Sequence, residues 1–284
     1  MTRTVIAQHP AYRDDIADLV TRRPLPGPKA EQLDPFLFLN HHGPQTYPPN
    51  NRGLPFGPHP HRGFETVTFM IEGPLAHHDT GGHQSVIGQG GVQWMTAGAG
   101  LVHAEISPED FKRSGGPLEI LQLWVNLPAR LKFAAPRYQG VQADAIPAIP
   151  LPDGAGTLNL VSGTYEGVQG PIESLTGIFM STVSLTAGAA ATLPAPAGRQ
   201  VFLYVVRGEL AVGGQAVKPW SLVELSDGEG ARVAAASDAL ILYGHAEPIG
   251  EPVVAHGPFV MNSRDEIVQA IQDYNAGKFG ALAL

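Results

Sequence analysis

The sequence predicts an all-β protein, built as two antiparallel β-barrels and completed by a short C-terminal helix. Glycine (34) and proline (26) are abundant among its 284 residues, whereas charged residues make up only 15%. This balance favours short strands joined by many turns. Apolar segments of strand length recur in two blocks, at about 56–126 and 158–245, and each block contains an apolar strand that ends at a glycine turn. The shared rhythm predicts a duplicated barrel.

The strands of both blocks are identified by apolar runs and by alternation. Val67, Phe69 and Ile71 occupy alternate positions and would share one face of a strand. Residues 1–50 are expected to be irregular, and the prolines of 127–157 predict a linker or crossover. Strands are predicted at 65–72, 92–95, 118–126, 178–185, 201–206, 209–212 and 239–243.

One helix is well signalled near the C-terminus. Ser263 and Glu266 form a capping box, with serine at the N-cap and glutamate three residues later. Gly277 is a suitable residue to end the helix. The apolar face between them has helical spacing and consists of Ile267, Ala270, Ile271 and Tyr274. We expect this helix to pack on a barrel.

Composition excludes several classes of function. The formal net charge of −8 and the lack of a basic stretch argue against nucleic acid as a direct partner. The absence of cysteine excludes disulfides, thiolate metal sites and a cysteine nucleophile. The N-terminus is too polar for a secretory signal, and no segment approaches the roughly 18 apolar residues of a membrane span. We expect a soluble, cytoplasmic protein that is monomeric, with a protein partner as an open alternative.

Two short motifs carry the chemistry. His59 and His61 form one pair, His103 and Glu105 the other, and the members of each pair are two residues apart. In a strand, residues i and i+2 point to the same face. Both pairs can therefore aim at one point inside a barrel, where three imidazoles and a carboxylate would bind a divalent transition metal and leave positions open for chemistry.

A second carboxylate competes for the same role. Glu65 lies four residues after His61, a spacing found among ligands of cupin barrels, and spacing alone leaves Glu65 and Glu105 both open. Glu65 could instead accept a hydrogen bond from a ligand imidazole. The doublets His41-His42 and His77-His78 are interpreted as loop histidines, because adjacent strand residues face opposite sides; His42 or His77 could still line a cavity. Isolated histidines are expected to be structural or solvated: His9, His83, His245 and His256.

The motifs resemble the signature of the pirin family, and the resemblance spans nearly the whole chain. Its central part, residues 59–68, 92–98 and 100–105, is specific, and weaker matches lie at 34–37, 257–262 and 277–280. The resemblance implies a bicupin, with an N-terminal metal-binding barrel at 1–130. It also implies a degenerate second barrel at 131–284, whose C-terminal segment returns to the first.

The resemblance also implies the ligand set, which is His59, His61, His103 and Glu105. It thereby prefers Glu105 over Glu65. The second barrel is expected to hold no metal, since Gly198-Arg199-Gln200 stands where an H-x-H would lie. The chain departs from the family at Asn40-His41-His42, a difference that bears on substrate preference if this segment borders the pocket.

As a function, the resemblance implies a non-haem metal-dependent dioxygenase that opens a flavonol such as quercetin with O₂. Glu105 would be the general base. Fe(II) is the expected metal, with Zn, Ni, Mn, Co or Cu able to occupy the site in purified protein. The alternative, which the family also suggests, is a metal- and redox-sensing regulator that acts through a protein partner without turnover. A third reading is a structural cupin whose metal only stabilises the barrel.

Overall fold

The computed structural model describes residues 2–283, and they form two compact units that are interleaved in the sequence. The first, here called the N-barrel, comprises Arg13–Arg22, Phe36–Ala143 and the chain from Ile249 on. The second, the C-barrel, comprises the chain up to Tyr12, Arg23–Pro35 and Asp144–Pro248. The boundaries at 1–130 and 131–284 stay a prediction about the two halves, because the compact units exchange their terminal segments.

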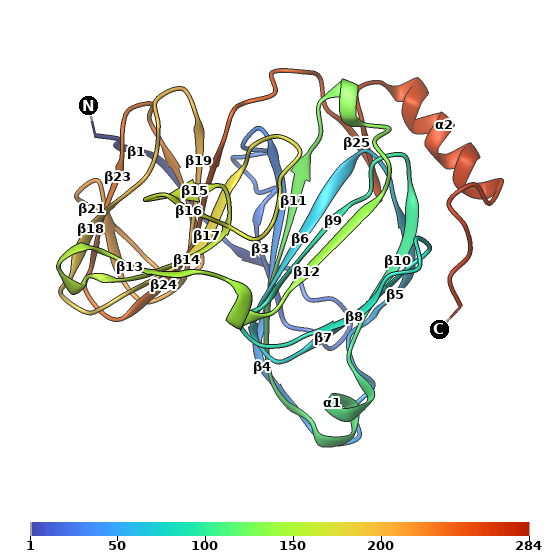
Figure 1. Ribbon diagram of the computed structural model, residues 1–284, viewed down its shortest axis with the longest axis horizontal. Coiled ribbons are helices and arrows are strands. Elements are labelled where there is room, and N and C mark those ends of the chain that lie inside the picture. The colour runs from blue at the N-terminus through green and yellow to red at the C-terminus, as the bar shows by residue number, and fades with distance from the viewer. Residues whose placement is uncertain (1, 284) are drawn as a thin grey trace. The chain divides into compact units, whose positions relative to one another are not determined.

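The N-barrel consists of a large and a small antiparallel sheet that face each other (Figure 1). The order of the large sheet is β12-β9-β6-β11-β4-β3-β2 and that of the small sheet is β5-β10-β7-β8. The strands of the large sheet are β2 (Tyr12–Arg13), β3 (Thr21–Leu25), β4 (Phe36–Tyr47), β6 (Phe64–Glu72), β9 (Val92–Thr96), β11 (Gly116–Asn126) and β12 (Arg137–Val141). Those of the small sheet are β5 (Phe56–His61), β7 (Leu75–Asp79), β8 (Gln84–Ile87) and β10 (Leu101–Ile106).

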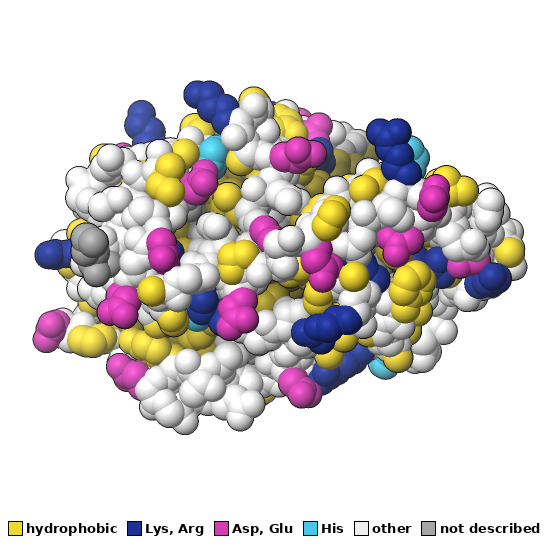
Figure 2. All heavy atoms as spheres, turned by 90° about the horizontal axis from the view of Figure 1, so that it is seen from above, with side chains coloured by type: hydrophobic (Ala, Val, Ile, Leu, Met, Phe, Trp, Pro, Cys, Tyr) yellow, Lys and Arg dark blue, Asp and Glu magenta, His cyan; other side chains and the backbone are white. Residues whose placement is uncertain are grey.

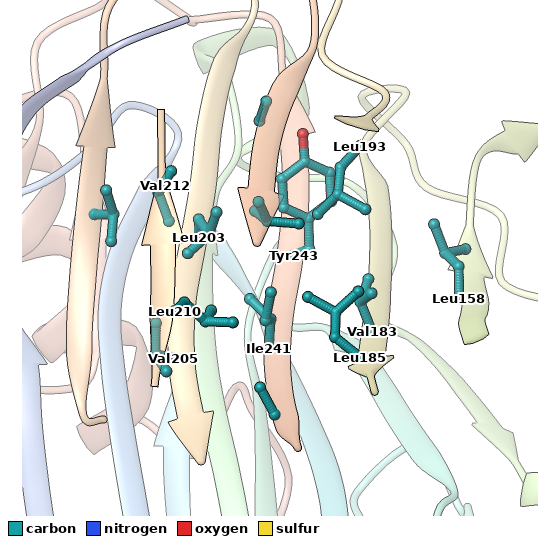
Figure 3. Close-up of a cluster of buried hydrophobic side chains, with 14 of the residues drawn as sticks. Leu158, Val183, Leu185, Leu193, Leu203, Val205, Leu210, Val212, Ile241 and Tyr243 are labelled. Atoms are coloured by element: carbon teal, nitrogen blue, oxygen red, sulfur yellow. The ribbon is translucent and has the colours of Figure 1, made fainter. Parts of the chain in front are cut away.

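The C-barrel repeats this plan with an apolar interior. Its large sheet has the order β1-β22-β19-β24-β17-β14-β13 and its small sheet β18-β23-β20-β21. Leu210 and Val212 from the small sheet pack with Leu203 and Ile241 from the large sheet in one buried cluster (Figure 3). The strands are β1 (Val5–Pro10), β13 (Ala148–Pro150), β14 (Gly156–Ser162), β17 (Phe179–Leu185), β18 (Ala190–Leu193), β19 (Gln200–Arg207), β20 (Leu210–Val212), β21 (Gln215–Val217), β22 (Ser221–Leu225), β23 (Ala231–Ala235) and β24 (Ala239–Ala246). A further hairpin is formed by β15 (Thr164–Tyr165) and β16 (Val168–Gln169).

The C-terminal segment adds a hairpin and a helix to the N-barrel. The hairpin consists of β25 (Val254–His256) and β26 (Phe259–Met261), and the helix is α2 (Arg264–Asn275). Ser263 is its N-cap and accepts a hydrogen bond from the Glu266 backbone N–H. The predicted N-cap at Ser263 and the C-terminal helix are therefore confirmed, as is the all-β class. Short helical pieces are α1 (Glu109–Ser114), η1 (Ala129–Leu131), η2 (Ala143–Ala145) and η3 (Pro152–Gly154).

The expectation that residues 1–50 are irregular was wrong, because they contain β1, β3 and the long strand β4. The proline-rich region 127–157 contains β12 and β13, and the chain passes from the N-barrel to the C-barrel within it, between Ala143 and Asp144, as predicted for a crossover. In both regions the pairing partner, rather than the local apolar pattern, stabilises the strand. β4 lies beside β11 although polar side chains interrupt its apolar run, and β12 pairs residue by residue with β9.

Charges of both signs are mixed on the surface in view in Figure 2. On the face of the molecule in Figure 2, Lys and Arg side chains are scattered among Asp and Glu and form no single basic patch. Within residues 2–283, no helix has both the length and the apolar character needed to cross a membrane.

Candidate metal centre

The H-x-H motif lies on β5, at the edge of the small sheet. Pro60 pushes His59 toward extended backbone, and a proline costs no ladder hydrogen bond where an edge strand turns its free side outward. His59 and His61 therefore share one face, with ring centroids 4.9 Å apart. His61 is buried, and His59 is partly exposed.

The neighbouring strand β10 brings the third imidazole to this pair. His103 is the direct cross-strand partner of His59, and their ring centroids lie 4.4 Å apart. The His61 and His103 centroids are 5.0 Å apart. One nitrogen from each of these imidazoles lies within 4.8 Å of the others. The convergence predicted from the two motifs thus exists for the imidazoles.

Hydrogen bonds to backbone carbonyls orient the H-x-H rings. His59 Nδ1 lies 2.7 Å from the Gly57 carbonyl oxygen, and His61 Nδ1 lies 3.2 Å from that of Pro258. Each Nδ1 must carry the proton to donate to its carbonyl, which leaves the Nε2 lone pair available as a metal ligand. His103 is fully buried, and neither of its ring nitrogens has a hydrogen-bond partner.

Burial keeps His61 and His103 neutral. The pKa of His61 falls from its ordinary 6.5 to about 3 because the ring is desolvated and His59 lies beside it. The pKa of His103 is also lowered well below its ordinary value, mainly by burial and then by His61 and His59. Neutral imidazole is the form that ligates a metal. His61 and His103 therefore present lone pairs to a metal at neutral pH.

Glu105 lies in the same barrel interior but in a different setting. Its Oε1 accepts hydrogen bonds from Thr68 Oγ1 at 2.8 Å and from Gln93 Nε2, while Oε2 accepts one from Gln122 Nε2. These donors come from β6, β9 and β11 of the opposite sheet. Among the described residues, the group of mutually close ligand atoms contains the three imidazoles and not this carboxylate. Coordination by Glu105 therefore stays a prediction.

The structure separates Glu65 from the imidazoles. Glu65 and Thr68 are three residues apart on β6 and so face opposite sides of the sheet, and Thr68 is the residue that meets Glu105 inside the barrel. Glu65 Oε1 instead accepts a hydrogen bond of 2.6 Å from Thr96 Oγ1. Burial raises the pKa of Glu65 from 4.5 to about 7. Of the two carboxylates that spacing left open, Glu105 is the one that lies in the barrel interior.

The expectation that the histidine doublets lie in loops was wrong. His41 and His42 are buried on β4, where the His41 Nε2 lies 2.8 Å from Glu119 Oε1 and the His42 Nδ1 lies 2.8 Å from Thr21 Oγ1. Adjacent residues do face opposite sides, as expected, but each side of this strand is covered. The polar partners come from segments distant in sequence, which local spacing does not reveal.

His77, which the sequence left open as a residue lining a cavity, lies beside His103, one of the three imidazoles. It is fully buried on β7, directly opposite Glu105, and its ring centroid lies 5.5 Å from that of His103. Its Nε2 lies 2.9 Å from Asp79 Oδ2, and its ring stacks on Tyr138 at 4.1 Å. The missed signal is the spacing of His77 and Asp79, which is two residues, as in the recognised motifs.

Aromatic side chains form a wall beside His61. The rings of Phe64 and Trp124 lie 4.9 and 5.4 Å from the imidazole, and Phe38 stacks on Trp124 at 4.6 Å. Phe38 and Trp124 keep partial exposure. The arrangement combines neutral ligand nitrogens with flat apolar surface, a combination suited to a planar aromatic molecule.

Comparisons with known proteins agree with this architecture. The family model described as pirin matches residues 18–125, and that of the pirin C-terminal cupin domain matches residues 180–280. A Pseudomonas aeruginosa protein named "putative quercetin 2,3-dioxygenase" is 43% identical over 88% of this chain and 87% of its own length. A pirin-like protein from Caulobacter vibrioides is 42% identical over 93% of this chain and 94% of its own length.

A solved structure has the same fold. The crystal structure of a quercetin 2,3-dioxygenase from Acinetobacter baumannii superposes with a TM-score of 0.93 at 32% identity, covering all of both chains. The large and small sheets of each barrel are thus those of a two-domain cupin protein. From its sequence motifs, its barrels and these matches, the chain belongs to the pirin family.

Proposed function

We propose that this protein is a metal-dependent dioxygenase that opens the ring of a flavonol such as quercetin. One observation carries the proposal. His103 is fully buried with both ring nitrogens unpartnered, inside a group of ligand atoms that lie within 4.8 Å of one another. Such burial is costly unless another group supplies the missing interaction. The similarity to a quercetin 2,3-dioxygenase supports the choice of substrate.

The proposed ligands are His59, His61, His103 and Glu105, with Fe(II) as the working ion. Other divalent ions, from Mn to Zn, fit the same donor set. When bound, the metal would supply Lewis acidity and, as Fe(II), a redox-active centre for reaction with O₂.

Glu105 would act as the proton acceptor for the acidic hydroxyl of the flavonol. Its two oxygens are not equivalent. Oε1 accepts from both Thr68 and Gln93 and has its two lone-pair directions filled, whereas Oε2 accepts only from Gln122. Oε2 therefore keeps acceptor capacity and is the atom that would receive the proton or contact the metal.

The flavonol rings would lie on the accessible part of the aromatic wall, which Phe38 and Trp124 provide because Phe64 is fully buried. This wall excludes water next to His61 and orients a planar substrate by stacking. Binding by shape and stacking leaves the hydroxyl of the substrate to reach the polar end of the site, where Glu105 lies.

The test is anaerobic loading with Fe(II), followed by addition of quercetin and O₂. We expect quercetin to be consumed with release of carbon monoxide. His103→Ala should abolish both metal binding and turnover. His78→Ala is the matched control, because His78 is on the neighbouring strand β7 but faces the opposite side from His77; it should retain both.

Two other outcomes would reject parts of the proposal. Stoichiometric metal binding without loss of quercetin or release of carbon monoxide would reject the dioxygenase reaction for this substrate. A partner captured only at one oxidation state of the iron would then favour the regulatory alternative. Unchanged metal content in His103→Ala would reject the metal site itself.

A further inference from the structure

A buried cation links the two metal-ligand motifs to the C-terminal helix. Arg62 follows His61 directly, and its side chain is almost fully buried. Its Nε donates to the Ala99 carbonyl at 2.7 Å, in the loop before β10, and its Nη1 donates to Asp273 Oδ2 on α2 at 2.8 Å. The guanidinium also lies 4.6 Å from the centre of the Phe279 ring. One side chain thus joins the end of β5, the approach to β10 and the C-terminal segment.

A second buried cation, Lys132, also connects the turn after His61 to the C-terminal segment. The Lys132 Nζ donates to the carbonyls of Gly63 at 2.8 Å and Val260 at 2.9 Å, and to Asn126 Oδ1 at 2.6 Å. The backbone at Gly63 (φ +87°) approaches that of Val260 so closely that a Cβ would fall 2.0 Å from the Val260 carbonyl oxygen. Gly63 is therefore needed for the chain after His61 to lie against β26.

This junction sets the position of one carbonyl that contacts a proposed ligand. Arg62 and Phe259 form a parallel bridge, and the Val260 N–H donates to the Arg62 carbonyl at 3.1 Å. The Pro258 carbonyl is thereby held where it accepts the Nδ1 proton of His61. Unlike Gly57, which orients His59 from within the same strand, Pro258 is 197 residues away from its histidine in sequence.

We propose that Arg62 and Asp273 are positioning residues of the metal centre. Their ion pair fixes the C-terminal segment so that the Pro258 carbonyl holds the His61 ring with Nε2 directed at the metal. The inference rests on the proposed metal site. Partners of a ligand histidine fix its tautomer and rotation, and their loss typically lowers metal affinity about 10- to 100-fold.

The test is the affinity of the chelator-stripped protein for Zn²⁺, measured by competition with a chromophoric chelator. Asp273→Asn keeps the shape of the side chain but removes its charge, and we expect affinity to fall about tenfold. Lys278→Met is the matched control. Lys278 is an exposed cation whose Nζ lies 2.7 Å from Oδ1 of the same carboxylate, but it does not contact Arg62. This variant should bind Zn²⁺ like the wild type.

A double-mutant cycle separates positioning from general destabilisation. His61→Ala keeps His59, the central imidazole His103 and Glu105, and its weaker Zn²⁺ binding is measured by direct titration. In this background Asp273→Asn should cause little further loss, because the residue through which it acts is absent. An equal loss in both backgrounds would overturn the inference, as would wild-type affinity in Asp273→Asn. If Asp273→Asn does not fold, Arg62→Lys replaces it. Lysine keeps the charge but cannot donate to the Ala99 carbonyl and the Asp273 carboxylate in the fixed geometry of a guanidinium. We expect the same loss of Zn²⁺ affinity, and again little further loss in the His61→Ala background.

The Zn²⁺ affinity of the wild type distinguishes failure of the proposed metal site from failure of the positioning role of Arg62 and Asp273. A wild-type protein that binds no Zn²⁺ would overturn the proposed metal site and this inference together. Tight wild-type binding without any effect of Asp273→Asn or Arg62→Lys would overturn only the inference.

Discussion

At the scale of single residues, burial has opposite consequences for His103 and Glu65. Both are at most 1% exposed. His103 lowers the cost of its burial by staying neutral, and its unpartnered nitrogens then suit a metal. Glu65 lies on the face of the large sheet that points away from the barrel interior. Desolvation favours its protonated form, which raises its pKa to about 7. Burial therefore leaves His103 in the neutral form that can bind a metal, and it moves the pKa of Glu65 close to neutral pH.

Glu65 makes stability depend on pH in a predictable direction. Its pKa is higher in the folded protein (about 7) than its ordinary value of 4.5, so the folded state binds the proton more tightly. Its contribution to stability is therefore fully present below pH 4.5 and is lost as pH rises through about 7. The shift corresponds to about 3 kcal/mol. Urea unfolding of the metal-free protein should show this loss in the wild type.

Glu65→Gln isolates this contribution from that of the histidines. Glutamine has nearly the same shape and does not titrate in this range, so the variant should lose less stability than the wild type between pH 5 and pH 8. Identical pH profiles for both proteins would show that Glu65 is not the group responsible.

At the scale of elements, the site depends on how β5 ends and on how β10 and α2 begin. In the turn after β5 the backbone of Gly63 lies against that of Val260, and in the loop before β10 Gly100 lies against the Phe279 ring. Helix α2 begins at a reciprocal cap, in which Ser263 accepts from the Glu266 N–H and the Glu266 carboxylate accepts from the Asn262 N–H at 3.0 Å. The cap follows β26 directly and fixes where the helix leaves the hairpin.

Ser263→Ala tests the contribution of this cap. Loss of an N-cap side chain typically costs about 1 kcal/mol, and we expect that decrease in the free energy of unfolding. Ser184→Ala is the control, since Ser184 is exposed on β17 and should change stability by less than about 0.5 kcal/mol. Equal effects of the two variants would contradict a capping role for Ser263.

At the scale of the whole molecule, two similar barrels have different interiors. The N-barrel holds imidazoles, carboxylates and amides around His103 and Glu105, whereas the C-barrel is filled by the apolar cluster of Figure 3. At the C-barrel position expected for an H-x-H, Arg199 donates to His245 Nδ1 at 2.8 Å. A lone pair that could ligate a metal is thus already engaged by a permanent cation.

Metal removal should therefore affect the barrels unequally. A ligand that binds only the folded state raises the free energy of opening of the region it holds. We expect amide hydrogen exchange in β5 and β10 to slow when the metal-free protein is loaded, and exchange in β19 and β24 to stay unchanged. Equal slowing in both barrels would contradict a metal site confined to the N-barrel.

Local patterns predicted the features that depend only on neighbouring residues. The spacing of His59 and His61 fixed a common face, and Ser263 with Glu266 fixed the start of α2. The interpretation of His41-His42 and His77-His78 failed for a complementary reason. Their burial depends on Glu119, Thr21 and Asp79, and only Asp79 is close in sequence to the histidine it pairs with.

The sequence by itself therefore determined that the chain is β-rich, which residues alternate onto one face, and which imidazoles are candidates for a metal. These follow from backbone geometry, which is local. The tertiary structure decided that Glu105 rather than Glu65 lies in the barrel interior, that the His77 ring lies beside His103, and that the Pro258 carbonyl accepts a hydrogen bond from His61. Strand pairing and the return of the C-terminus bring together residues far apart in the chain, and no spacing rule along the chain encodes that proximity.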